Sequence, residues 1–112
     1  VHYPGLVSHP QHARAAALFG SRFGGLLGVE LAEGVDCFDF LNRLRIVLMA
    51  THLGDTRSLA LPAAHTIYYE MGAERRKQMG IADSLIRVSV GIEDETDLLF
   101  DFDQALNGSL QG

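Results

Sequence analysis

The clearest hydrophobic pattern in the chain is an alternation over residues 85–90, LIRVSV. Ile86 and Val88 fall on one side of an extended chain. Arg87 and Ser89 fall on the other side. Alternation with a period of two residues predicts a β-strand with one buried face. The pattern therefore places an arginine in the middle of an otherwise apolar strand, where it faces either solvent or a cleft.

The pattern changes to a helical period soon after this strand. Residues 94–106 begin with several acids and continue with apolar residues spaced three and four positions apart. Asp94 is the expected N-cap, because a short carboxylate side chain accepts hydrogen bonds from the free N–H groups of the first helical turn. The expected buried stripe of this helix consists of Leu98, Leu99, Phe102, Ala105 and Leu106.

Three further segments are predicted to be helical. Residues 8–20 have Ser8 as a candidate N-cap and end at Gly20. Residues 74–80 form a short helix or turn that a glycine closes. Residues 35–49 form the strongest predicted helix, because acids lie near its start and arginines toward its end, as the helix dipole favours. Its expected inner face consists of Phe38, Leu41, Leu44 and Leu48, with Cys37 and Val47 beside it.

Residues 23–31 and 57–62 are predicted to be two more strands. The resulting order is helix, strand, helix, strand, short helix, strand and helix. Few strands among several helices indicate one α/β domain, residues 1–112, built as a two-layer sandwich. We expect a small sheet of three to four strands that is covered by helices.

Composition and charge narrow the classes of partner. The chain has 112 residues, of which 47% are hydrophobic and 21% are charged, as is typical of one globular domain. Its net charge is −5 and its longest basic cluster is RRK at residues 75–77. A phosphate-binding surface needs more positive charge, so we expect no nucleic-acid partner. No apolar run is long enough to span a membrane, so no membrane partner is expected either.

Cys37 is the single cysteine, so the chain cannot form an internal disulfide, and a reducing, cytoplasmic location is expected. The thiol lies among apolar residues and has no basic neighbour, which favours a core role over a nucleophilic one. The chain opens with Val1 in VHYPGL, which reads like the interior of a protein. We therefore expect it to be a piece of a longer chain.

Candidate chemistry centres on Arg87 and His52. A guanidinium on a strand is either solvated or salt-bridged, or it grips a carboxylate through two parallel hydrogen bonds, and the pattern alone leaves both readings open. Ser89 lies on the same face and is a candidate to assist. His52 lies in the turn THLGDT, residues 51–56, between two predicted elements, where functional loops often occur.

The sequence does not predict a metal site or a catalytic residue. His9 and His12 have the i, i+3 spacing that suits one metal ion, but no nearby Cys, Asp or Glu completes the ligand set. The spacing of the remaining polar residues forms no catalytic triad and no clear carboxylate pair.

Several segments together resemble one family, and they do so in order along nearly the whole chain. They are YPGLVSHPQHARA (3–15), FGGLLGVEL (23–31), LGDTRSLALPAAH (53–65) and MGIADSLIRVSVGIEDETDLLFDFDQAL (79–106). They resemble the C-terminal domain of the pyridoxal-phosphate-dependent enzymes of cysteine and methionine metabolism. This trans-sulfuration family includes cystathionine γ-synthase, the cystathionine lyases, methionine γ-lyase and the acylhomoserine sulfhydrylases.

The resemblance implies the fold of the C-terminal domain of fold-type I pyridoxal-phosphate enzymes. In this family a large domain holds the cofactor and its Schiff-base lysine, and the C-terminal domain closes over an amino-acid substrate. The family arginine that binds the substrate α-carboxylate corresponds to Arg87. The implied reaction is β- or γ-elimination or γ-replacement at a cystathionine, homoserine-ester or methionine-like substrate, catalysed by a homo-oligomer.

Some positions depart from the family pattern. His52 stands where the family often has a serine, and we expect it and Thr51 to contact the substrate or cofactor. The sole lysine, Lys77, lies outside any family lysine motif. The chain is therefore expected to be the C-terminal domain alone and to be inactive by itself. Two alternatives stay open, a non-catalytic amino-acid-binding or regulatory module that uses Arg87, and a purely structural association domain.

Overall fold

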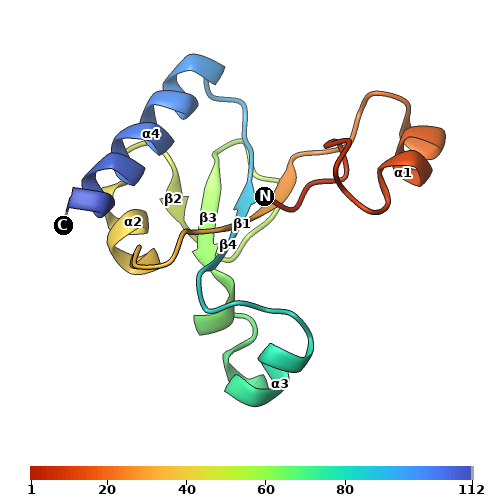
Figure 1. Cartoon of the computed structure of the whole chain (residues 1–112). Coiled ribbons are helices and arrows are strands. Elements are labelled where there is room, and N and C mark those ends of the chain that lie inside the picture. The colour runs from red at the N-terminus through yellow and green to blue at the C-terminus, as the bar shows by residue number, and fades with distance from the viewer. Residues whose placement is uncertain (112) are drawn as a thin grey trace.

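Four strands form a single mixed sheet in the computed structural model, which describes residues 1–111 (Figure 1). The strands lie in the order β1-β4-β3-β2. The central strand β4 runs antiparallel to both of its neighbours, whereas β2 runs parallel to β3. The strands are β1 (Leu26–Glu30), β2 (Leu48–Met49), β3 (Leu59–Pro62) and β4 (Leu85–Ser89).

The helices are α1 (His12–Phe19), α2 (Cys37–Arg43), α3 (Ala73–Gln78) and α4 (Glu95–Gln111), with two short 3₁₀ turns, η1 (Ala63–His65) and η2 (Tyr69–Met71). α2 and α4 lie together against one face of the sheet (Figure 1). This arrangement confirms the predicted α/β sandwich with a small sheet of three to four strands. Within residues 1–111, no helix is both long enough and apolar enough to cross a bilayer.

The alternation in residues 85–90 sets the orientation of the central strand. Ile86 and Val88 are fully buried and point toward the helices, as predicted. Arg87, between them, points to the opposite face, which α2 and α4 do not cover. The helix-facing core is completed by residues from the other elements, among them Phe40, Leu41, Ala60, Leu98 and Ala105. The face turned away from α2 and α4 is called the open face below, although loops cover part of it, since Leu61 and Ser89 on this side are buried.

The prediction of one helix over residues 35–49 is wrong beyond Arg43. α2 ends there, and the chain continues in an extended conformation into β2. The carboxylate of Asp101 on α4 accepts hydrogen bonds from the N–H groups of residues 45, 46 and 47, at 2.8, 2.8 and 3.0 Å. These N–H groups would bond to carbonyls four residues earlier if the helix continued. A contact with a residue more than fifty positions away therefore replaces the end of the predicted helix.

The inner face predicted for residues 35–49 is correspondingly only partly right. Leu41 is buried and Leu44 is half-buried. Phe38 and Leu48 are 43% and 40% exposed, so their assignment to the inner face is wrong. Phe38 packs its ring against His65, with ring centroids 5.1 Å apart, and Leu48 lies on the edge strand β2.

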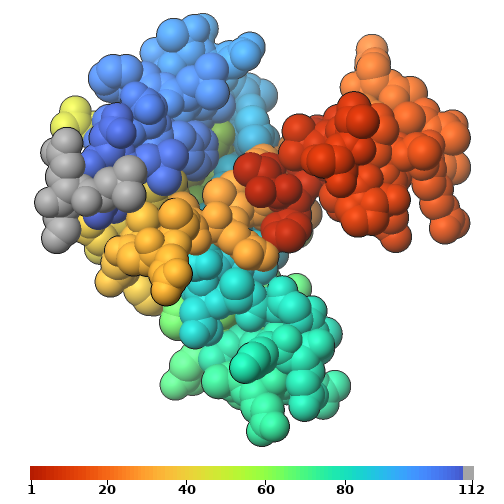
Figure 2. Space-filling view, in the orientation of Figure 1, coloured from red at the N-terminus to blue at the C-terminus, as the bar shows by residue number. Residues whose placement is uncertain are grey.

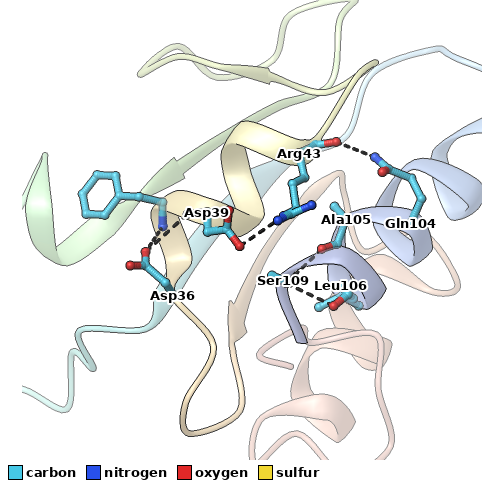
Figure 3. A network of polar contacts seen from close by, with 8 residues as sticks. Asp36, Asp39, Arg43, Gln104, Ala105, Leu106 and Ser109 are labelled. Atoms are coloured by element: carbon cyan, nitrogen blue, oxygen red, sulfur yellow. Dashed lines mark hydrogen bonds and ion pairs between the residues drawn. The ribbon is translucent and has the colours of Figure 1, made fainter. Parts of the chain in front are cut away.

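Polar contacts cap α2 and join it to α4 (Figure 3). The Asp36 carboxylate accepts hydrogen bonds from the first free N–H groups of α2, and Arg43 pairs with Asp39 one turn earlier at 3.1 Å. Gln104 on α4 donates to the carbonyl of Arg43, the last residue of α2. Cys37 at the start of α2 is buried, and this burial raises the pKa of its thiol, as expected of a core cysteine.

α4 begins as predicted but leaves part of its stripe uncovered. The Asp94 carboxylate accepts hydrogen bonds from the N–H groups of Thr96 and Asp97 and so caps the helix. Leu98, Phe102 and Ala105 face the core. Leu99 and Leu106 were also expected in the buried stripe, but Leu99 is 64% exposed and Leu106 is 38% exposed, so that expectation is wrong.

The helix predicted at residues 8–20 is shorter than expected. α1 begins at His12 and has no side-chain cap, so the N-cap prediction for Ser8 is wrong. Pro10 disfavours the helical conformation at His9, which precedes it, and this is consistent with a helix that does not begin at Ser8. The helix ends at Gly20 as predicted, in a left-handed conformation that suits glycine.

Two lobes project from the sandwich. Residues 3–24, which contain α1, form one lobe beyond β1, and the segment that carries α3 forms another (Figures 1 and 2). The predicted strands 23–31 and 57–62 are confirmed at shorter lengths as β1 and β3, and the short helix at residues 74–80 is confirmed as α3.

Candidate functional site

Arg87 lies at the centre of the open face. Its Cα is paired with Gly28 on β1 and with Leu61 on β3, so strands flank it on both sides. Its Nη2 donates a hydrogen bond of 2.8 Å to the main-chain oxygen of Thr51. The guanidinium is thus held over the sheet by a backbone group rather than by an acidic side chain.

The loop at residues 51–55 is fixed to β4 at two points. Arg87 holds Thr51 through its carbonyl oxygen, and the hydroxyl of Ser89 accepts a hydrogen bond of 3.2 Å from the N–H of Gly54. His52 lies between these two anchors and is exposed. The structure therefore brings Arg87, Thr51 and His52 to one place, with Thr51 joined to Arg87 by its backbone. Ser89, which the sequence offered as an assistant, is buried and positions the loop.

The charge of Arg87 is not neutralised within the described part of the chain. Among residues 1–111 the side-chain contacts between basic and acidic groups are His2 with Glu30, ionic only when the imidazole is protonated, and Arg43 with Asp39, and neither involves Arg87. A groove of about 350 Å³ borders its side chain on the open face, with Gly28 and Tyr68 among the lining residues. A half-exposed guanidinium with free N–H groups is chemically suited to receive a carboxylate from outside.

A second network of hydrogen bonds, which the sequence analysis missed, joins the segment just after the loop at residues 51–55 to the segment that follows β4. The Glu93 carboxylate accepts hydrogen bonds from the N–H and hydroxyl of Ser58, at 2.7 and 2.8 Å. The same hydroxyl accepts a hydrogen bond of 2.8 Å from the N–H of Gly91. The hydrogen bond from the Ser58 backbone lowers the pKa of Glu93, so the carboxylate stays ionised. The only signal in the sequence was an acidic residue, Glu93, shortly after the predicted strand, and the sequence analysis gave it no role.

Asp55 shapes the other end of the loop. Its carboxylate accepts a hydrogen bond of 3.0 Å from the N–H of Arg57, which closes a local turn and lowers the pKa of Asp55. Gly54 precedes it with a φ of 68°, a conformation that glycine adopts without strain. The loop that carries Thr51 and His52 is thus ordered by its own turn as well as by β4.

The histidines other than His52 have partners within the chain. His9 accepts a hydrogen bond from the N–H of Gln11, and His12 bonds to the Pro4 carbonyl while its ring stacks on Phe23. Within the described residues, no three His, Cys, Asp or Glu side chains lie close enough together to hold a metal ion. The i, i+3 spacing of His9 and His12 is therefore accounted for by local packing.

Pyridoxal phosphate does not fit the described residues as they stand, because no lysine borders Arg87. Lys77 is exposed on α3 and lines a different, shallow groove with Gly80 and Asp83. A cofactor that must be bound through a lysine would need that lysine from elsewhere.

The fold and the site define a small α/β domain that presents an unneutralised arginine on the open face of its sheet. Residues 1–107 match the family model described as Cys/Met metabolism PLP-dependent enzyme, and the chain belongs to this family. The family name itself specifies pyridoxal phosphate as the cofactor of its members.

Individual relatives agree with this assignment. The chain is 41% identical over 110 residues to L-methionine gamma-lyase of Pseudomonas putida, and 40% identical over 106 residues to cystathionine gamma-lyase of Bacillus subtilis (strain 168). These alignments cover 97% and 95% of this chain but 27% and 28% of the relatives. The crystal structure of cystathionine gamma-lyase from Lactobacillus plantarum complexed with L-serine superposes with a TM-score of 0.88 at 33% identity, over 97% of this chain and 28% of that one. The chain thus spans a little over a quarter of the length of these enzymes.

Proposed function

We propose that this chain is the C-terminal, substrate-closing domain of a longer pyridoxal-phosphate-dependent enzyme that makes or breaks carbon–sulfur bonds. The observation that carries this proposal is Arg87, whose guanidinium stands unneutralised on the open face beside the loop of Thr51 and His52. Family membership and the share of the relatives that the chain spans support it. The likeness does not distinguish elimination from replacement, since lyases and sulfhydrylases both align with the chain.

Arg87 binds the α-carboxylate of the amino-acid substrate in this proposal. Its planar fork can donate two parallel hydrogen bonds, which fix the orientation of the carboxylate as well as its position. The hydrogen bond from Arg87 Nη2 to the Thr51 carbonyl uses one of the N–H donors of the guanidinium and restricts the movement of the side chain. Because the carboxylate is held in one orientation, the bonds of the adjacent α-carbon can point in fewer directions. The arginine therefore contributes to the orientation of the substrate as well as to its affinity.

Thr51 and His52 form the edge of the same site. The carbonyl of Thr51 is engaged by Arg87, which leaves its side chain and the imidazole of His52 on the exposed loop surface. We assign both residues a substrate-contacting role. His52 differs from the serine that is frequent at this position in the family, so it is the residue most suited to give this protein its own substrate preference.

The cofactor-binding lysine belongs to the part of the relatives that this chain does not span. Pyridoxal phosphate supplies an electron sink for bond cleavage next to the α-carbon when it is bound. The residues described here bind and orient the substrate and carry no catalytic group of their own. The complete enzyme is proposed to be a homo-oligomer in the cytoplasm, where a buried free thiol such as Cys37 stays reduced.

A direct test of the missing lysine uses the chain alone. The 112-residue protein is mixed with pyridoxal phosphate, dialysed and examined by absorbance spectroscopy. We expect no cofactor absorbance after dialysis, because Lys77 lies on an exposed helix away from Arg87. A retained, stoichiometric band that Lys77→Arg removes would contradict the proposal, since the chain would then hold the cofactor itself.

A second test examines Arg87 in an active polypeptide that contains this chain. Arg87→Ala should raise KM strongly and lower kcat/KM by the equivalent of about 2 to 3 kcal/mol, as expected for a charged hydrogen-bonded pair. Arg75→Ala, which removes an exposed arginine on α3, is the matched control and should leave both constants unchanged. An Arg87→Ala enzyme with the KM of the wild type would rule out the carboxylate role.

One alternative is a non-catalytic module that binds an amino acid through Arg87. The observation in its favour is that the arginine, its loop and the adjoining groove are complete within this chain. Such a module should bind a free amino acid tightly without cofactor. Calorimetric titration of the chain with L-methionine and L-serine distinguishes the two functions, since a substrate-closing domain that lacks the rest of its site should bind them only weakly.

A further inference from the structure

Residues 51–57, called the β2–β3 connection here, are held in place by hydrogen bonds rather than by packing. All of them are exposed, so apolar burial contributes little to their position. Within the described part of the chain, every hydrogen bond from the connection to another segment goes to residues between 87 and 92, on β4 or just after it. The place of Thr51, whose carbonyl anchors Arg87, therefore depends on these bonds and on the two ends of the connection.

Ser58 fixes the second end of the β2–β3 connection and is almost fully buried. Its carbonyl accepts a hydrogen bond of 3.1 Å from the N–H of Leu48 on β2, and its hydroxyl accepts one of 2.8 Å from the N–H of Gly91. Its N–H and its hydroxyl both donate to the Glu93 carboxylate, at 2.7 and 2.8 Å. Every polar group of Ser58 is thus paired, so a shift of this residue would leave a buried donor or acceptor without a partner.

Glu93 supplies the charged part of this contact. Both of its carboxylate oxygens accept hydrogen bonds from Ser58, and bonds to an ionised acceptor are roughly twice as strong as neutral ones. The N–H of the preceding residue, Ile92, donates to the carbonyl of Thr56 at 2.9 Å. Glu93 and Ile92 together hold the second half of the β2–β3 connection, whereas β4 holds the first half through Arg87 and Ser89.

We infer that Glu93 is a positioning residue for the binding of the substrate carboxylate, because by holding Ser58 it fixes the β2–β3 connection whose Thr51 carbonyl anchors Arg87. The inference rests on the proposed function, in which Arg87 binds that carboxylate. Glu93 itself makes no hydrogen bond or ion pair with the guanidinium and acts only through the connection. When its contact is weakened, the Thr51 carbonyl loses its fixed place, so the guanidinium adopts more orientations and binds the carboxylate less well.

Steady-state kinetics of Glu93→Gln test this inference in an active polypeptide that contains this chain. The assay uses the amino acid that the enzyme turns over among L-cystathionine, L-methionine and O-acetyl-L-homoserine. Glutamine keeps the shape of Glu93 but has one acceptor oxygen and no charge, so KM should rise about threefold to tenfold with little change in kcat. Glu95→Gln, which neutralises an exposed acid at the start of α4, is the matched control and should leave both constants unchanged.

The comparison of KM with kcat separates a positioning role from a purely structural one. A substitution that only destabilises the fold reduces the amount of active enzyme, which lowers the apparent kcat and leaves KM as it was. Loss of a fixed carboxylate-binding geometry instead weakens the binding of the substrate and raises KM. A Glu93→Gln enzyme with a lower kcat and the KM of the wild type would therefore overturn the inference.

Combining Glu93→Gln with Arg87→Ala shows whether Glu93 acts through the arginine. The double variant should have the kcat/KM of Arg87→Ala alone, because the group that Glu93 helps to position is then absent. Two effects that multiply in the double variant would overturn the inference, since Glu93 would then affect binding by another route. A wild-type KM for Glu93→Gln beside a raised KM for Arg87→Ala overturns the inference and leaves the proposed function intact, whereas a wild-type KM for both variants contradicts both.

Discussion

Arg87 has room on the open face because of the two residues that are paired with it. Gly28 on β1 has no side chain, and Leu61 on β3 is buried beneath the neighbouring segments. A Cβ at residue 28 would contact Leu85 at 3.3 Å and His2 at 3.5 Å, so a larger residue there would crowd the groove that borders the arginine. Glycine at residue 28 thus adds no side chain to the groove beside Arg87, which Leu85 and His2 also line.

Gly91 has the tightest surroundings among the residues that support the site. A Cβ there would overlap the backbone of Thr56 and Arg57, which cannot move without disturbing the Glu93–Ser58 network. Gly91→Ala should therefore lower the free energy of unfolding by about 1 to 3 kcal/mol, the usual range for overpacking. Urea denaturation followed by circular dichroism measures this change.

The control for this substitution is Gly28→Ala, whose added methyl group would meet no backbone atom but only the side chains of Leu85 at 3.3 Å and His2 at 3.5 Å. It should cost less than about 1 kcal/mol, in the range typical of surface substitutions and glycine-to-alanine changes. Equal stability of Gly91→Ala and the wild type would mean that the loop at residues 56–58 has space which the structure does not contain.

At the scale of elements, the sequence predicted best where one segment carried a complete pattern. β4 and α4 were recognised because alternation, the Asp94 cap and the helical stripe all lie within residues 85–106. Arg87 could be singled out for the same reason, since it interrupts a local pattern. The end of α2 could not be predicted, because the Asp101 carboxylate that takes over its backbone N–H groups is distant in the sequence.

In the candidate site, too, the features with a local sequence pattern were predictable and those that depend on distant contacts were not. The loop of Thr51 and His52 was located from its place between two elements, which is local information. Its attachment to Arg87 and Ser89, and the support from Glu93, depend on contacts between segments more than thirty residues apart. Contacts at that separation leave no periodicity in a single sequence. The expectation that Thr51 and His52 share a site with Arg87 therefore came from the family resemblance and not from the pattern.

At the scale of the whole molecule, ionised carboxylates connect segments that are distant in sequence. Asp101 is almost fully buried, which alone would raise its pKa, but hydrogen bonds from the N–H groups of Arg45, Val47 and Ile46 outweigh this and lower the pKa. Glu93 joins the loop at Ser58 to the segment after β4, and its pKa is also lowered. Neither contact involves a lysine or arginine side chain as the donor, so backbone N–H groups supply the compensation.

These directions fix the sign of the pH dependence of stability. A carboxyl group with a pKa below its unfolded value, which is about 3.9 for aspartate, stabilises the folded state at every pH above that value. The stabilisation is lost as the pH falls from about 4 toward the lower folded-state pKa, because the unfolded chain then binds protons more readily. The urea midpoint of the wild type should therefore fall steeply between pH 5 and about pH 2.

Asp101→Asn tests how much of this pH-dependent stability comes from the Asp101 carboxylate and its hydrogen bonds to residues 45–47. The amide cannot ionise and presents only one acceptor oxygen to the three N–H groups, so the variant should be less stable than the wild type at pH 7 by about 2 to 3 kcal/mol. The difference should shrink as the pH falls below about 4, because the unfolded wild-type chain then binds a proton at Asp101, and the folded carboxylate follows only at its lower pKa. Asp103→Asn, at an exposed position two residues further along α4, should follow the wild-type curve at every pH. Parallel curves for Asp101→Asn and the wild type would show that Asp101 does not carry its charge in the folded protein, and with it the account of how α2 ends would fail.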